Sequence, residues 1–244
     1  MAKVIVVTGA GGWLGSAIAR AFGEAGDKVL VNDINPATLP AVTSAINKGP
    51  GQAVPYVANT RNYEEVKAMV DEAVNLWGKL DVMACVAGGN LTRLNGTTKE
   101  NEKLLTEYSD EDWDLVVDTN LKGIFHSIKA ASGPMMAQQD GQIIIMGSWA
   151  GFKGGIRRTA YSAAKAGVVG LMKTAALELG DYNIRLNVVA PGKNPHPGEV
   201  SKPLEGNILK RTNTPGEVAA FFVHLSRMKN VSGQIINLDS GILF

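Results

Sequence analysis

Tyr161 and Lys165 are the residues of this chain best suited to move a proton. They stand at positions i and i+4 of the segment Tyr-Ser-Ala-Ala-Lys, so both side chains share one face if the segment is helical. A free tyrosine has a pKa of about 10, too high for a base at neutral pH, and a nearby ammonium group favours the phenolate and lowers that pKa. The pair is therefore predicted to exchange a proton with an alcohol or carbonyl oxygen while a hydride leaves or arrives.

Two polar residues extend this pair. Ser148 follows an apolar run, and its hydroxyl is expected to hold the substrate oxygen against the phenol of Tyr161. Asn120 lies inside an expected helix, where asparagine has poor propensity. A buried amide needs polar partners, and we expect this one to hold a water in a proton path to Lys165. A surface lysine beside a packed tyrosine is the alternative interpretation of the pair alone, but the four residues together favour catalysis.

A glycine-rich turn near the N-terminus has the residues needed to bind a diphosphate. The segment 8–15 contains Gly9, Gly12 and Gly15, follows the first apolar run and precedes a helical pattern. Glycines at such a junction let the backbone turn tightly and approach a pyrophosphate, while the free N–H groups of the helix attract its charge. This context predicts dinucleotide binding.

Asp33 is the residue expected to choose the cofactor. It ends the second apolar run, where a carboxylate can bind the hydroxyls of the adenosine ribose and repel a 2′-phosphate. The next residues, Ile34-Asn35-Pro36, supply no arginine for such a phosphate. We therefore predict NAD rather than NADP. The alternative is that Asp33 only caps the helix that begins near Pro36.

The surrounding elements alternate between two patterns. Short apolar runs rich in β-branched residues are predicted to be strands at 3–7, 28–32, 53–57, 80–86, 142–146, 184–189 and 234–238. Amphipathic helical patterns separate them at 14–25, 36–47, 63–77, 110–138, 160–179 and 216–225. Strands that are apolar throughout and alternate with helices indicate a parallel sheet buried on both faces. The predicted fold class is α/β, a Rossmann-type doubly wound sheet of about seven parallel strands.

Composition narrows the functional classes. The 244 residues are predicted to form one domain, 1–244, and carry 24 basic and 23 acidic side chains, which favours neither nucleic acid nor an anionic membrane as partner. Cys85 is the only cysteine, the three histidines lack metal-ligand spacing, and no signal or membrane-spanning pattern is evident. We therefore expect a cytoplasmic protein that acts on a small molecule without a metal.

Two polar segments, 88–108 and 193–214, interrupt the alternation after strands and are expected to shape the substrate site. Basic residues in these two segments and between Ser148 and Tyr161 suggest an anionic substrate, such as a hydroxy acid, a keto acid or an acyl thioester. Surface charges or subunit contacts are the alternative. These residues are Arg93, Lys153, Arg157, Arg158 and His196.

Taken together, these motifs resemble those of the short-chain dehydrogenase/reductase family over nearly the whole chain, in its branch of about 250 residues. They are the turn 8–15, Asp33, Ala87-Gly88, Asn120, Gly147-Ser148, the Tyr161/Lys165 pair, Asn187-Val188-Val189-Ala190-Pro191-Gly192 and the segment 231–241. The resemblance implies a catalytic tetrad of Asn120, Ser148, Tyr161 and Lys165, with Lys165 also binding the nicotinamide ribose. It also implies a homotetramer or homodimer formed through the helices that hold Asn120 and Tyr161. The cofactor contacts it implies are Gly9, Gly12, Trp13, Leu14, Gly15, Asp33, Asn59, Thr60, Ala87, Gly88, Tyr161, Lys165, Pro191 and Gly192.

The chain departs from the family pattern at several cofactor positions. Trp13 stands where the middle glycine of the turn is usual, Cys85-Val86 replaces Asn-Asn, and Asn59 replaces a common aspartate. A threonine usual after Pro191-Gly192 is also missing. Two alternative functions therefore stay open, a non-catalytic dinucleotide sensor and a lyase-type enzyme without net redox chemistry. The intact tetrad opposes the first, and Lys165 with Asp33 opposes the second.

Overall fold

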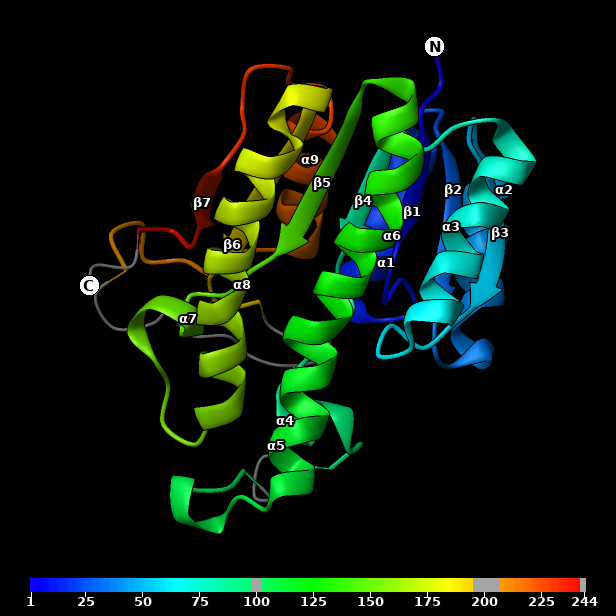
Figure 1. Cartoon of the computed structure of the whole chain (residues 1–244). Helices are drawn as coiled ribbons and strands as arrows, with labels where there is room; N and C mark the ends of the chain where they lie inside the picture. Colours follow the sequence, from blue (N-terminus) through cyan, green and yellow to red (C-terminus); the bar gives the residue numbers. More distant parts are fainter. Residues whose placement is uncertain (98–101, 195–206, 242–244) are drawn as a thin grey trace.

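The chain folds around a seven-stranded parallel sheet in a computed structural model that describes residues 1–97, 102–194 and 207–241 (Figure 1). The strands run in the order β3-β2-β1-β4-β5-β6-β7, and every neighbouring pair is parallel. Their bounds are β1 (Val4–Val7), β2 (Lys28–Asp33), β3 (Gln52–Val57), β4 (Val82–Cys85), β5 (Gly141–Met146), β6 (Ile184–Pro191) and β7 (Gln234–Leu238). The predicted fold class is confirmed, and the predicted strands differ from these bounds by at most two residues.

Helices cover both faces of the sheet, as Figure 1 shows. One face carries α3 (Tyr63–Trp77), α6 (Gly123–Gln138) and α8 (Thr159–Leu179), whose buried residues share one core cluster with the sheet. The other face carries α1 (Trp13–Glu24), α2 (Leu39–Asn47) and α9 (Pro215–Leu225). Shorter helices, α4 (Leu91–Leu94), α5 (Asp110–Val117) and α7 (Ala150–Lys153), lie beyond the carboxyl ends of the strands.

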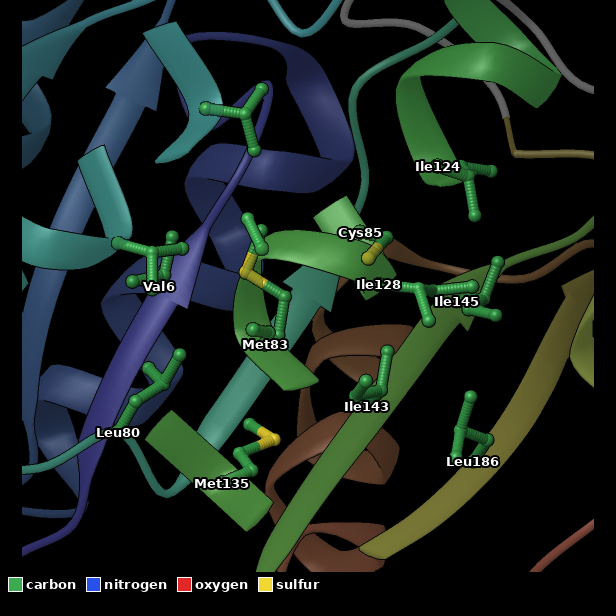
Figure 2. Packing of buried hydrophobic residues seen from close by; sticks show 14 of the residues in the cluster. Val6, Leu80, Met83, Cys85, Ile124, Ile128, Met135, Ile143, Ile145 and Leu186 are labelled. Carbon is green, nitrogen blue, oxygen red and sulfur yellow. The ribbon is translucent and has the colours of Figure 1, made fainter. Parts of the chain in front are cut away.

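Alternation along the strands divides the apolar residues between the two cores. In β1, Val4 and Val6 pack into one cluster, whereas Ile5 and Val7 pack into the other. Successive side chains of a strand point to opposite faces, so a strand covered on both faces must be apolar at every position. Figure 2 shows one of these cores, where Met83 and Cys85 of β4 lie among residues of β5 and α6.

Both ends of α3 were predicted to the residue, whereas one long predicted helix is interrupted in the structure. Asn62 caps α3 by accepting a hydrogen bond from the Glu64 N–H, and Gly78 ends it in the left-handed conformation. The predicted helix 110–138 is instead interrupted by a π-turn, η4 (Asp118–Lys122). A π-turn inserts one residue into the helical register and is common at functional sites.

Candidate active site

A cavity of about 440 Å³ lies beyond the carboxyl ends of the strands, where the order of the sheet reverses between β1 and β4. Ligands of doubly wound sheets bind at such a switch point. The cavity brings together most of the predicted site residues: Gly9, Gly12, Leu14, Gly15, Asp33, Asn59, Thr60, Ala87, Gly88, Ser148, Tyr161, Lys165, Pro191 and Gly192. The described lining of the cavity does not include Trp13 or Asn120.

The glycine turn forms a cradle that side chains would fill. Gly9 has a φ of +65°, and a Cβ there would lie 2.7 Å from the Ala87 Cα. A Cβ at Gly15 would overlap the Gly9 carbonyl oxygen. Helix α1 then begins at Trp13 with Gly12 as its N-cap and no side-chain capping bond, so free N–H groups face this end of the cavity. The turn fits a diphosphate group despite the unusual Trp13.

Asp33 holds the glycine turn against the end of β2. Its Oδ2 accepts a hydrogen bond from the Gly11 N–H at 3.0 Å, and its Oδ1 accepts one from the Asn35 N–H at 3.0 Å. The capping residue before Pro36 is Asn35, whose Oδ1 accepts from the Ala37 N–H. The alternative role of Asp33 as helix cap is therefore wrong, and its carboxylate lines the cavity.

A second charged side chain, that of Arg61, lies at the Asp33 end of the cavity and was not predicted from the sequence. Arg61 lines the cavity just after β3, and its backbone N–H and Nε both donate to the Asn59 Oδ1, at 3.1 and 3.4 Å. The residues that directly follow Asp33, Ile34-Asn35-Pro36, contain no cation, so the sequence pattern near Asp33 did not predict Arg61. Because β3 pairs with β2, the residues after its carboxyl end belong to the same corner, and this pairing is the signal that could have found Arg61.

Thr8 and Asn120 hold the loop that follows β4. The Thr8 Oγ1 accepts hydrogen bonds from the N–H groups of Val86 and Ala87, at 3.0 and 3.2 Å. Asn120, fully buried in the π-turn, accepts from the Gly89 N–H at 3.1 Å and donates to the Gly89 carbonyl at 2.8 Å.

The Asn120 amide donates a further bond to the Val116 carbonyl, at 2.9 Å. All these partners are backbone groups. The side chain therefore positions the loop at Gly89. The water expected on a path from this amide to Lys165 stays a prediction.

Ser148, Tyr161 and Lys165 meet at the opposite end of the cavity. Ser148 follows β5 and is hydrogen-bonded to Tyr161, which lies in the first turns of α8. Lys165 lies one turn further along α8, with its Nζ 5.7 Å from the centroid of the Tyr161 ring. The same ammonium donates to the Met146 carbonyl at 2.8 Å, which fixes the buried lysine against the end of the sheet.

Burial perturbs both titratable groups of this triad. It raises the pKa of Tyr161, while the hydrogen bond from Ser148 and the charges of Arg158 and Arg93 act in the lowering direction. The predicted net lowering of this pKa is therefore wrong in this structure, because enclosure of the phenol outweighs the neighbouring charges. Burial also lowers the pKa of Lys165 to about 8. At neutral pH this geometry presents a protonated phenol beside an ammonium group.

Cys85 lies under Lys165 at the end of β4, as part of the core drawn in Figure 2. Burial raises the pKa of this thiol to about 12, although a hydrogen bond with Ser127 and the charge of Lys165 act against the rise. The side chain is 1% exposed, so it is inert as a nucleophile. Cys85 therefore serves as a small apolar side chain of the buried core.

The arginines before α8 are paired with the segment 102–108. The Arg157 Nη1 donates to the Glu102 carbonyl at 2.6 Å and lies 3.8 Å from the Glu107 carboxylate, and the Arg158 Nη2 lies 3.7 Å from the Glu102 carboxylate. Neither arginine lines the cavity in the described part of the chain. The alternative of structural surface charges therefore fits both, and Arg93 is the predicted anion-binding residue that does line the cavity.

Some predicted features lie elsewhere. His196 and most of the loop 193–214 fall outside the described residues, although Asn194 lines the cavity. Trp113, a large apolar residue for which a core position is the simplest prediction, is instead 39% exposed on α5. Among the described residues, no group of three or more His, Cys, Asp or Glu side chains could hold a metal ion. None of the described helices is both long and apolar enough to span a bilayer.

Comparisons with known proteins agree with this geometry. The profile of the short chain dehydrogenase family matches residues 3–195. The 3-oxoacyl-[acyl-carrier-protein] reductase FabG of Thermotoga maritima is 34% identical to this chain over 99% of it and 98% of the relative. The 3-oxoacyl-[acyl-carrier-protein] reductase of a Synechocystis species is 35% identical over 99% and 97%. A crystal structure of NAD⁺-bound xylitol dehydrogenase superposes with a TM-score of 0.86 at 26% identity and covers 98% of each chain.

Proposed function

The chain belongs to the short-chain dehydrogenase family and is an oxidoreductase of CH–OH groups that uses a nicotinamide cofactor. From this premise we propose that it reduces the ketone of a 3-oxoacyl thioester with NADH. The observation that carries the proposal is one cavity that joins a glycine cradle to Ser148, Tyr161 and Lys165. The two reductases that resemble the chain over its whole length act, by their names, on 3-oxoacyl groups and support this substrate class.

The chain's own residues supply the proton chemistry of this reaction. When bound, the nicotinamide ring supplies the hydride that adds to the carbonyl carbon of the substrate. Tyr161 donates its phenolic proton to the carbonyl oxygen, and its raised pKa keeps that proton in place at neutral pH. The Ser148 hydroxyl bonds to Tyr161 and would orient the same oxygen. Lys165, beside the phenol, would hold the ribose hydroxyls of the bound cofactor. Asn120 is a positioning residue, since its bonds go to the loop that walls the cavity.

The preference for NADH rests on Asp33. Its carboxylate lies in the cavity beside Gly11 and would repel a 2′-phosphate on the adenosine ribose. Arg61 lines the same corner, but its side chain is directed to the Asn59 Oδ1. The negative charge of Asp33 is therefore the feature that we expect to dominate.

Exposed apolar residues on three helices support an assembly of two or four copies. Trp113 on α5, Phe125 on α6 and Leu177 on α8 are 39%, 44% and 84% exposed. Helices α5 and α6 each pack against α8, so these side chains lie on adjoining elements that a second copy would cover. Light scattering of the purified chain tests this assembly, and a monomer at micromolar concentration would contradict it.

The test of the activity is a turnover assay with acetoacetyl-coenzyme A and each of NADH and NADPH, in wild type and Tyr161→Phe. We expect NADH-dependent reduction in the wild type and a loss of at least about a hundredfold in kcat in the variant, with cofactor binding retained. Binding of NADH without turnover of this thioester or of a panel of secondary alcohols and ketones would favour the sensor. Failure to bind either dinucleotide would refute the proposal.

A further inference from the structure

Arg93 projects from α4 across the loop after β4 and reaches the glycine turn. A Cβ built on Gly89 would lie 2.7 Å from the Arg93 Cδ, so the stem of the arginine passes directly over that glycine. A Cβ on Gly12 would lie 2.5 Å from the Arg93 Nη2 and 3.7 Å from its Cζ. The guanidinium therefore occupies the space above Gly12, at the N-terminus of α1.

Among the described residues, no acidic side chain neutralises the charge of this guanidinium. Within residues 1–97, 102–194 and 207–241, no carboxylate forms an ion pair with Arg93 and its guanidinium makes no hydrogen bond. By contrast, Arg157 and Arg158 are both engaged with the segment 102–108. The charge of Arg93 reaches the other end of the cavity as well, where it acts to lower the pKa of Tyr161 and of Lys165.

Two positive features thus meet at one place in the cavity. The uncapped N-terminus of α1 offers free N–H groups and a partial positive charge, and the Arg93 guanidinium faces the same turn from the other side of the opening. A guanidinium binds phosphate oxygens through two parallel N–H donors, an arrangement that a helix N-terminus alone does not provide. The ligand that suits this place is a diphosphate lying between the turn and the arginine.

We propose that Arg93 clamps the diphosphate of the dinucleotide against the glycine turn, and that Gly12 is a glycine because this guanidinium needs the space above it. The proposal rests on the cofactor binding of the proposed function. It also accounts for the unusual glycine spacing of the turn. Trp13 replaces the usual middle glycine, and Gly12, the glycine beside it, is the one that contacts Arg93.

The experiment measures dissociation constants of NADH and ADP-ribose by fluorescence and calorimetry for wild type, Arg93→Gln and Arg93→Lys. Loss of a charged hydrogen-bonding partner should weaken both ligands about 10- to 100-fold in Arg93→Gln and less in Arg93→Lys. Adenosine, which has no phosphate, should bind all three proteins equally. Arg20→Gln on the exposed face of α1 is the matched control and should leave every constant unchanged.

A double-mutant cycle tests the link to Gly12. Gly12→Ala should displace the guanidinium and weaken NADH binding, whereas the same change in the Arg93→Gln background should add little. Additive losses would overturn the proposed link. Unchanged NADH and ADP-ribose constants in Arg93→Gln would overturn the clamp, and so would a higher KM for an anionic substrate with cofactor binding intact. Failure of the wild type to bind either dinucleotide would instead refute the proposed function, so the two failures are distinguishable.

Discussion

Replacing Asn120 by alanine should release the loop after β4, which lines the cavity, from the hydrogen bonds that hold it. The amide is fully buried and makes three hydrogen bonds, two with the backbone of Gly89 and one with the Val116 carbonyl. Truncation leaves the Gly89 N–H and C=O groups without these partners in a buried place. The loop 86–89 would then be held mainly by the Thr8 hydroxyl at its start.

The size of the effect follows from the number of groups left unpaired. Each buried backbone group that loses its partner costs about 1–3 kcal/mol, and water entering from the adjacent cavity should recover part of that loss. We therefore expect Asn120→Ala to reduce the free energy of unfolding by about 2–4 kcal/mol. Cofactor affinity should fall as well, because Gly88 and Gly89 line the cavity.

Urea denaturation followed by tryptophan fluorescence measures the change, with Asn62→Ala as the matched control. Asn62 is an exposed helix cap that accepts one bond from the Glu64 N–H, and its loss should cost about 1 kcal/mol without changing cofactor affinity. If Asn120→Ala destabilised the chain no more than this control, while kcat alone fell, the positioning role would be refuted. A direct part in proton transfer would then be the better account.

Three other predictions concern the two ends of the cavity. Lys165, with a pKa near 8, should lose its proton as the pH rises through that value while Tyr161 stays protonated, so kcat/KM for ketone reduction should fall above about pH 8; a plateau extending past pH 9.5 would contradict this. Asp33→Ser should shift the ratio of NADPH to NADH affinity toward NADPH by about tenfold, because a repulsive charge disappears, and an unchanged ratio in paired titrations would show that Asp33 does not choose the cofactor. Gly15→Ala should weaken NADH binding by at least about a hundredfold, since the new Cβ meets immobile backbone at Gly9, whereas Gly133→Ala, which has open space around it, should bind normally; equal titrations for the two variants would show that the turn can yield.

Local patterns predicted most of the fold because local physics determines those parts. Helix α3 matches its predicted bounds to the residue, since Asn62 and Gly78 mark both ends with capping chemistry. The interruption of helix 110–138 was not predicted, because no residue type specifies a π-turn. Asn120 in mid-helix was the only local sign of it. A core position was the simplest prediction for Trp113, but it lies on a face of α5 that the described residues leave partly exposed.

The proximity of Tyr161 and Lys165 was predictable for a different reason than the residues at the other end of the cavity. Tyr161 and Lys165 are neighbours within one helix, so their spacing alone places them together. Arg61 reaches the Asp33 end of the cavity only through the pairing of β3 with β2, and Arg157 reaches Glu102 only through the path of the segment 102–108. Contacts of this kind depend on how strands pair and loops pack in the folded chain, and the local spacing of residues does not reveal this.

Because Cys85 is buried, the rate at which its thiol reacts can report local unfolding of the protein. It is the only thiol in the chain, and a pKa near 12 together with 1% exposure protects it from alkylating reagents in the native state. Each labelling event must therefore wait for β4 to separate from its neighbours, so the labelling rate measures local unfolding beneath the active site without any engineered probe. A cofactor that binds above Lys165 should slow that rate, which makes occupancy readable by mass spectrometry in a mixture where no catalytic assay is possible.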